Sequence, residues 1–271
     1  MATDVLGDLV ARERRSDAVA LRVDATGREI SYRDFCTTAW KAGHALSHCG
    51  VHPGARVALA PDPAPQPLLT LFGAACLGAR VTFDTEAATR AVLVPADREG
   101  DVERRPGRAV VVYGDAPGDP GVTHWERTVW SENPVRPPGE RDADEVVLDG
   151  EEPRSSSSRT GSDDSEASPT PRAERDDVPQ ATGDAGSTAY THREVLSAAA
   201  RVVDAAGLDA DTSVGLRAPL TDPRTVVAGV VAPLSVGGTV VLPDGKSDAD
   251  VTVDGGEAGN ESAFHVADVF L

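Results

Sequence analysis

The spacing of apolar residues predicts a first half in which helices and strands alternate. Between Ser31 and Gly50, apolar side chains recur at the three- and four-residue intervals of a helix, with Ser31 as the N-cap. A second helix is predicted between Leu68 and Gly78, and a short amphipathic helix over residues 5–14. Strands are expected at residues 19–23, 56–60, 79–83, 91–94 and 109–113. This alternation is typical of a parallel sheet covered by helices.

The last third of the chain repeats the same order of elements. Thr191 and Glu194 have the spacing of a capping box, and an apolar helical stripe follows them. A further helix is predicted to begin at Asp222 and to be kinked or shortened by Pro233, because proline cannot donate a backbone hydrogen bond. Strands are expected at residues 213–217 and 239–242.

The two regions can be aligned with each other at an offset of about 160 residues. Val57 then aligns with Val214, and Val81 with Val240. The alignment indicates two copies of one helix–strand–helix–strand unit. The alternative explanation is chance similarity between generic α/β segments.

Residues 150–187 differ in composition from the segments on either side. They are rich in Ser, Pro, Asp and Glu, and Val178 is their one large aliphatic residue. Such a segment buries too little apolar area to offset the entropy lost on ordering, so we expect a disordered acidic linker. The prediction is therefore an α/β fold of two similar half-domains, residues 1–149 and 188–271, with mainly parallel sheets flanked by helices.

Composition and charge restrict the partners and the compartment. The 271 residues include 44 acidic and 26 basic side chains, for a formal net charge of −18. Such a chain repels phosphate backbones and anionic lipid surfaces, so we expect neither nucleic-acid nor membrane binding. The N-terminus has no apolar region of the kind found in signal peptides, and three unclustered cysteines are typical of reduced thiols. These features favour a cytoplasmic protein.

The acidic composition also favours adaptation to molar salt, as in halophilic archaea. The chain has many Asp residues, two lysines (Lys41 and Lys246) and only 4% aromatic residues. Molar salt screens the self-repulsion of a highly charged chain. The alternative is a high-GC genome that favours Arg over Lys in a protein that happens to be acidic.

Several segments resemble the AMP-forming acyl-CoA synthetases, the superfamily that includes luciferases and the adenylation domains of peptide synthetases. In the first half, residues 31–35 (SYRDF) and 50–59 (GVHPGARVAL) are similar to that superfamily's N-terminal region. In the second half, residues 190–196 (YTHREVL) resemble the helix start that follows its phosphate loop. Residues 227–242 resemble the next helix and strand. The resemblance implies a large domain built from two similar α/β halves.

The same resemblance implies a Ser/Thr/Gly-rich phosphate loop that ends in a lysine. Residues 182–187 lie at the matching distance from His192, but they have Gly186 in place of the lysine and an acidic Asp184. The other candidate for this loop is residues 157–161, which have hydroxyls and an arginine. The alternative interpretation of both stretches is an ordinary low-complexity loop. The weak remnant candidates for nucleotide binding are Thr182, Gly183, Thr191 and His192.

The other chemical motifs of the superfamily are not matched. The Tyr-Gly-x-Thr-Glu motif, the ribose-binding Asp and the lid lysine have no counterparts before the chain ends at Leu271. His44, His48 and His52 are spaced by four, but a glycine and a proline place His52 beyond the helix, so we expect no metal site. No catalytic residue is assigned.

These observations lead to a functional expectation. We expect a degenerate or truncated synthetase-like protein, a pseudoenzyme that acts as a non-catalytic binding or interaction module. The alternative is an acyl-CoA ligase component completed by another synthetase-like chain. ATP, AMP and magnesium are expected only if activity is retained.

Overall fold

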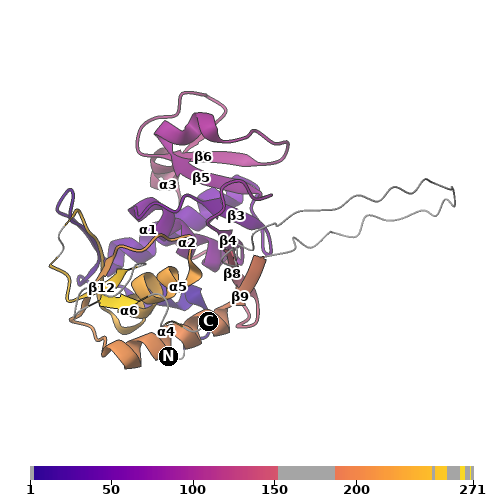
Figure 1. Cartoon of the computed structure of the whole chain (residues 1–271). Helices are drawn as coiled ribbons and strands as arrows, with labels where there is room; N and C mark the ends of the chain where they lie inside the picture. The colour runs from indigo at the N-terminus through magenta and orange to yellow at the C-terminus, as the bar shows by residue number, and fades with distance from the viewer. Residues whose placement is uncertain (1–2, 152–186, 246–247, 255–262, 266–268, 270–271) are drawn as a thin grey trace, which may run out of the picture.

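The computed structural model describes residues 3–151, 187–245, 248–254, 263–265 and 269. The alternation of helices and strands predicted from the sequence is confirmed, and the fold is mixed α/β with two mainly parallel sheets flanked by helices (Figure 1). Across the described ranges, every helix is too short or too polar to span a bilayer.

The described strands of the first sheet number seven, in the order β7-β6-β5-β3-β4-β8-β9. All neighbouring pairs are parallel except β8 and β9, which run antiparallel. The strands are β3 (Arg56–Leu59), β4 (Arg80–Thr82), β5 (Ala91–Pro95), β6 (Ala109–Tyr113), β7 (Thr123–His124), β8 (Val146–Glu151) and β9 (Ser187–Thr191). The inner strands are mainly Val, Leu and Ala, as expected of strands buried on both faces.

The second sheet contains six described strands in the order β13-β12-β10-β11-β1-β2. Only the hairpin of β1 and β2 is antiparallel. The strands are β1 (Val19–Val23), β2 (Arg28–Ser31), β10 (Ser213–Leu216), β11 (Thr239–Leu242), β12 (Val251–Asp254) and β13 (Ala263–His265).

The two sheets exchange strands across the region assigned to the linker. β1 comes from the start of the chain but pairs with β11 in the second sheet, where Leu21 lies opposite Val240. β9 follows residue 186 but completes the first sheet through β8. The domain boundaries at residues 149 and 188 remain a prediction. Each sheet contains strands from both of the predicted half-domains.

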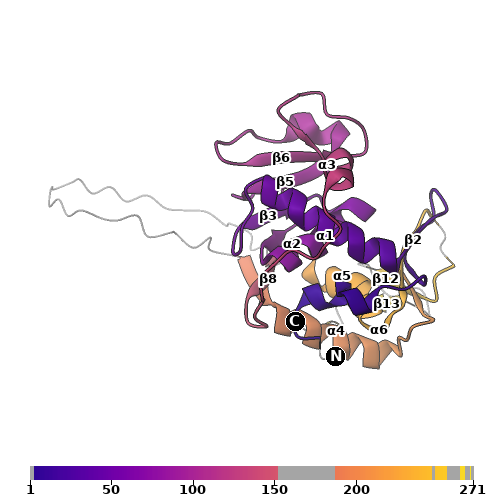
Figure 2. The same cartoon turned by 180° about the vertical axis from the view of Figure 1, so that it is seen from behind.

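Helices cover both sheets and pack on one another (Figures 1 and 2). The helical elements are η1 (Leu6–Val10), η2 (Arg12–Arg14), α1 (Tyr32–His48), α2 (Pro65–Leu77), η3 (Ala96–Asp101), α3 (Trp125–Ser131), α4 (His192–Ala206), α5 (Pro223–Val226), η4 (Val227–Val231) and α6 (Ala232–Val236). α1 and α2 cross closely at Gly43 and Gly73. A Cβ added to Gly73 would lie 2.6 Å from the carbonyl oxygen of Ala39, so only glycine fits there.

The predicted internal repeat agrees with the strand registers. Val57 lies opposite Val81 between β3 and β4, and Val214 lies opposite Val240 between β10 and β11. The hairpins that precede α1 and α4 also match, because each has its register shift at the same place before the helix. In the order of the chain, residues 152–186 come between β8 and β9 as residues 24–27 come between β1 and β2.

Two predicted helices differ from the structure. Residues 5–14 form two short 3₁₀ helices, η1 and η2, that turn Leu6, Leu9 and Val10 into the core instead of one amphipathic α-helix. The helix that begins at Asp222 widens into the π-helical segment η4 just before Pro233. The proline ring would clash with the carbonyl four residues earlier in a regular α-helix, and the wider turn relieves that clash.

The sequence also missed several elements. β2, β7, α3, β8, β9, β12 and β13 were not predicted, and Gly150, Glu151 and Ser187 belong to strands instead of the linker. The rest of the predicted linker lies outside the described residues. The three cysteines are unbridged thiols, as expected.

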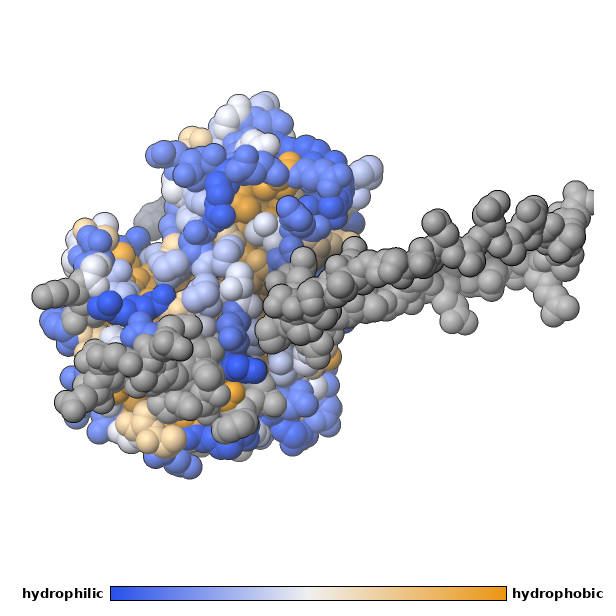
Figure 3. Space-filling view, in the orientation of Figure 1, coloured by the Kyte–Doolittle hydropathy of each residue, from blue (hydrophilic) through white to orange (hydrophobic). Residues whose placement is uncertain are grey.

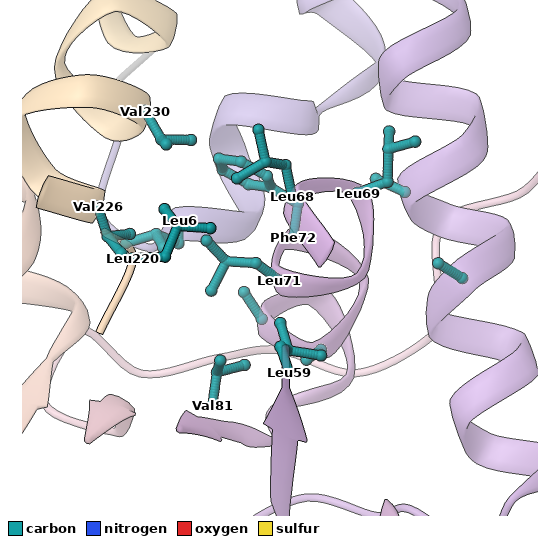
Figure 4. Close-up of a cluster of buried hydrophobic side chains, with 14 of the residues drawn as sticks. Leu6, Leu59, Leu68, Leu69, Leu71, Phe72, Val81, Leu220, Val226 and Val230 are labelled. Atoms are coloured by element: carbon teal, nitrogen blue, oxygen red, sulfur yellow. The ribbon is translucent and has the colours of Figure 1, made fainter. Parts of the chain in front are cut away.

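The core between the two halves is centred on Leu6 (Figure 4). Leu6 lies between Leu68 and Leu71 of α2 on one side and Leu220 and Val226 on the other. All five side chains are essentially inaccessible to solvent. Burying such side chains contributes about 2 kcal/mol each. The N-terminal segment thus joins the two halves through apolar contacts.

Candidate functional site

The candidate site is the antiparallel pair of β8 and β9 together with the first turn of α4. The chain leaves β8 at Glu151, returns at Ser187 and enters α4 at His192. The resemblance places a phosphate loop ahead of this helix, between a strand and the helix start. The loop itself, including the candidates Thr182 and Gly183, lies outside the described residues.

Thr191, the third candidate, serves the helix. Its side-chain oxygen accepts a hydrogen bond from the backbone N–H of Glu194 at 3.2 Å. The Glu194 carboxylate in turn accepts from the Thr191 backbone N–H at 2.8 Å and from its hydroxyl at 2.9 Å. The predicted capping box is therefore confirmed. Both groups of Thr191 are occupied by the N-terminus of α4.

His192, the fourth candidate, is a buried structural residue. Its side chain lies in the core, with 1% of its surface exposed, and Nδ1 accepts a hydrogen bond from the backbone N–H of Leu6 at 3.1 Å. Burial lowers the pKa of the imidazole to about 4. The ring is neutral at neutral pH, and it offers no charge to a phosphate group.

Asp149 on β8 is the buried carboxylate of the site, and the sequence analysis did not single it out. Arg56 donates from Nε to one carboxylate oxygen at 2.7 Å, and Arg80 donates from Nη2 to the other at 2.6 Å. The Asp149 side chain is 2% exposed, and the two arginines are about one quarter to one third exposed. This three-residue ion cluster ties β8 to β3 and β4.

Gly150 and Tyr190 lie where the strand pair meets the second half of the chain. A Cβ on Gly150 would lie 2.5 Å from Cγ of Pro223 and 2.9 Å from Cε2 of Tyr190. β8 can therefore approach the start of α5 only because residue 150 is glycine. Burial raises the pKa of the Tyr190 hydroxyl. The Asp149–Gly150 pair was the available sequence signal for this contact. It was assigned to the boundary of the linker because the residues after it are rich in Ser, Pro, Asp and Glu.

The described side chains of this site do not fit a nucleoside triphosphate. Arg193 is the cationic residue of the first turn of α4, and its Nε donates to Asp144 at 2.8 Å. Arg56 and Arg80 are bonded to Asp149, and His192 is neutral. No cation on the described parts of β8, β9 or this first turn is left to balance phosphate charge. We therefore derive no adenylation step through these residues.

The two histidines on α1 from the predicted series, His44 and His48, make separate local contacts. Nε2 of His44 lies 3.0 Å from the carbonyl oxygen of Val135, and Nδ1 of His48 lies 2.7 Å from a carboxylate oxygen of Glu132. Within the described ranges, no three His, Cys, Asp or Glu side chains gather as a metal site requires.

The face of the molecule drawn in Figure 3 is mainly polar. Hydrophilic residues cover most of the face seen in Figure 3, and apolar residues appear only in small separate areas. This distribution agrees with the formal charge of −18.

Comparison with solved structures identifies the fold. The anthranilate CoA ligase AuaEII in complex with anthranoyl-AMP matches with a TM-score of 0.70 and 17% identity, over 92% of this chain and 49% of that one. ATP-bound MatB from Rhodopseudomonas palustris matches with a TM-score of 0.67 and 14% identity, over 93% of this chain and 49% of MatB. A putative long-chain-fatty-acid CoA ligase from the same organism gives 0.67 and 16%, over 92% and 63% of the two chains.

The extent of these matches matters for their interpretation. No protein-family model matches the sequence, and a search of curated proteins finds no match. This chain spans about half the length of the first two ligases. The N-terminal domain of FACL13 from Mycobacterium tuberculosis also matches, with a TM-score of 0.66 and 14% identity, over 92% of this chain and 62% of that one. This match indicates that the shared half is the N-terminal one. The chain has the fold of the N-terminal half of AMP-forming CoA ligases.

Proposed function

We propose that this chain is a non-catalytic binding or interaction module with the fold of an AMP-forming CoA ligase. The observation that supports the proposal is that side chains next to the β8–β9 pair are bonded to other parts of this chain. Thr191 caps a helix, His192 accepts a bond from the N-terminal segment, and Arg193 pairs with Asp144. These three side chains are therefore engaged in contacts that hold the fold together, which supports a role without catalysis.

Nucleotide binding and catalysis are tested separately. The full chain is titrated calorimetrically with ATP, AMP and CoA at high salt, and ATP–pyrophosphate exchange is measured with and without magnesium. We expect no exchange by the chain alone. Exchange by the purified chain overturns the non-catalytic proposal.

A matched pair of variants locates any nucleotide that binds. Arg193→Gln lies at the first turn of α4, and Arg33→Gln lies at the aligned position of α1. Each arginine has an acidic partner, Asp144 or Asp17, and each is at least half exposed. Binding at the β8–β9 pair is weakened by Arg193→Gln alone. Equal weakening by both variants indicates a non-specific effect of charge.

The second candidate is an acyl-CoA ligase component that a partner chain completes. It is supported by the presence of the strand–loop–strand–helix scaffold in a chain that spans 49% of the length of ATP-bound MatB. Co-purification of a second synthetase-like chain, followed by pyrophosphate exchange only in the mixture, supports this candidate. In that case ATP or AMP and magnesium would be bound by the assembled pair. A cytoplasmic, salt-adapted setting remains part of the proposal.

A further inference from the structure

A hollow lined by arginines opens at the edge of the first sheet opposite to the β8–β9 turn. Its volume is about 490 Å³, and Arg56, Arg90, Arg105 and Arg108 line it together with Thr89 and His52. Arg56 begins β3, Arg90 immediately precedes β5 and Arg108 immediately precedes β6. Because these strands are parallel neighbours, their amino-terminal ends bring the arginines together.

Two of these arginines form no direct ion pair with a carboxylate in the described structure. Arg56 pairs with Asp149, and Arg105 pairs with Glu103 at 2.5 Å. Arg90 donates only to the backbone carbonyl oxygens of Gly50 and Gly107, at 3.0 and 2.9 Å. Arg108 likewise donates to a carbonyl oxygen, that of Thr85. The hollow therefore holds two arginines whose printed hydrogen bonds all go to backbone carbonyls, in a chain whose formal charge is −18.

The hollow also contains polar atoms that lack partners. Nε of Arg108 and Oγ1 of Thr89 are both buried, and neither has a hydrogen-bond partner. Leaving such an atom unsatisfied is unfavourable, since it loses its bonds to water and gains none in return. Burial, and then the positive charge of Arg105, lower the pKa of the Arg108 guanidinium. Asp84 and Glu103 act on the same group in the opposite direction.

We propose that the arginine hollow binds the phosphate group of a small molecule. A phosphate dianion matches the charges of Arg90 and Arg108, and its three oxygens can accept from guanidinium groups on neighbouring strands. The hydroxyl of Thr89 and Nε of Arg108 are buried in the lining, and they become further donors when their side chains turn toward the ligand. The volume exceeds that of a phosphate ion alone, so it leaves room for an organic substituent. This proposal does not rest on the proposed function, although Arg56 belongs to both places through its pair with Asp149.

The test is a titration of the full isotope-labelled chain, followed by amide NMR at constant ionic strength. The probes are inorganic phosphate and glycerol 3-phosphate, and glycerol is the neutral control. We expect saturable shifts of the Thr89, Arg90 and Gly107 amides, with no saturable shift at Thr188 or Tyr190. Tighter binding of glycerol 3-phosphate indicates a phosphomonoester ligand, and tighter binding of inorganic phosphate indicates the free ion; either order supports the site.

Variants decide whether the hollow is responsible. Arg108→Gln is expected to weaken phosphate binding about tenfold or more, because it removes charge-assisted hydrogen bonds. Thr89→Ala removes one donor with no change of charge, and it is expected to weaken binding about threefold. Arg33→Gln makes the same charge change far from the hollow and should leave binding unchanged. The absence of saturable shifts at the three amides, or equal weakening by Arg33→Gln, overturns the proposal.

Discussion

The backbone N–H of Leu6 donates to Nδ1 of His192 at 3.1 Å, between residues 186 positions apart in the chain. This bond attaches the N-terminal segment to the first turn of α4. The imidazole must be neutral to accept it, and burial already lowers its pKa to about 4. His192, which was selected because its sequence context resembles a nucleotide site, therefore connects the N-terminal segment to α4.

The stabilisation that comes from the buried His192 imidazole is expected to depend on pH. The folded pKa of about 4 lies below the usual 6.5, so the unfolded chain binds the proton more tightly. The stabilisation is complete above about pH 6.5 and is lost as the pH falls toward about 4. Between about pH 7.5 and about pH 5, this group should lower the free energy of unfolding by about 2 kcal/mol. Urea unfolding of the wild type and of His192→Gln measures the difference.

The control for this measurement is His44→Gln, which changes a half-buried histidine that contacts a backbone carbonyl. It should retain the pH response of the wild type, whereas His192→Gln should lack the histidine contribution. Equal pH responses in the wild type and His192→Gln would contradict the role of the buried imidazole.

The equivalent caps Ser31 and Thr191 should contribute equally to stability. Each side-chain oxygen accepts from a backbone N–H three residues on, that of Asp34 or Glu194. Replacing either by Ala should lower the free energy of unfolding by about 1 kcal/mol, which chemical denaturation measures. Ser197→Ala, at an exposed position within α4, is the matched control and should be close to neutral. If Thr191→Ala is as stable as the wild type, the capping hydrogen bond does not stabilise the protein and the prediction is wrong.

The Asp149 cluster should be strongly stabilising. Asp149→Ala removes the acceptor of both Arg56 and Arg80, and breaking such a buried pair is expected to cost about 3 kcal/mol. Asp17→Ala removes an exposed partner of Arg33 and should cost less than about 1 kcal/mol. Thermal unfolding of both variants separates the two cases. Similar costs for the two would mean that water screens the buried cluster as fully as the surface pair.

The close crossing of α1 and α2 predicts intolerance of a methyl group. In Gly73→Ala the added carbon would lie 2.6 Å from two backbone atoms, the Ala39 oxygen and the Gly43 nitrogen. The helices must move apart, at an expected cost of about 1–3 kcal/mol. Gly100→Ala has no atom within 4 Å of the new carbon and should change stability by less than about 0.5 kcal/mol. Denaturation midpoints of the two variants check this contrast.

The charge of −18 predicts a requirement for salt. As the salt concentration falls below roughly 0.5 M, screening weakens and repulsion between carboxylates grows, so helical circular dichroism should decrease. Dialysis from potassium chloride into dilute buffer, with spectra recorded at each step, measures the loss. An unchanged spectrum in dilute buffer would favour the explanation from genome composition instead.

Local patterns in the sequence predicted much of this fold because local chemistry determines helix ends and buried strands. Ser31, Thr191 and Asp222 cap helices as expected, and Gly78 and Gly207 end them in the left-handed conformation. The repeat could be aligned because equivalent valines occupy equivalent strand positions. β8 was missed because its end, Asp149 and Gly150, is polar or small and is stabilised by distant arginines.

The candidate site was harder to predict for the same reason. Thr191 and His192 were selected by resemblance, but their roles depend on partners that local spacing does not reveal, above all Leu6 for His192. The arginine hollow was missed because Arg56, Arg90 and Arg108 are far apart in sequence. They meet only because their strands are neighbours in the sheet.

The exchange of strands between the sheets has a consequence for how the chain is made. β1 leaves the ribosome early, yet its partner β11 lies near the other end, and the Thr239 hydroxyl donates to the Val19 carbonyl across 220 residues. The edge of the β1–β2 hairpin that pairs with β11 stays unpaired until residues 239–242 have been synthesised. Such late pairing slows folding and exposes strand edges to aggregation. Synthesis in a crowded cell therefore favours a chaperone, or a highly charged surface, that protects this edge until β11 arrives.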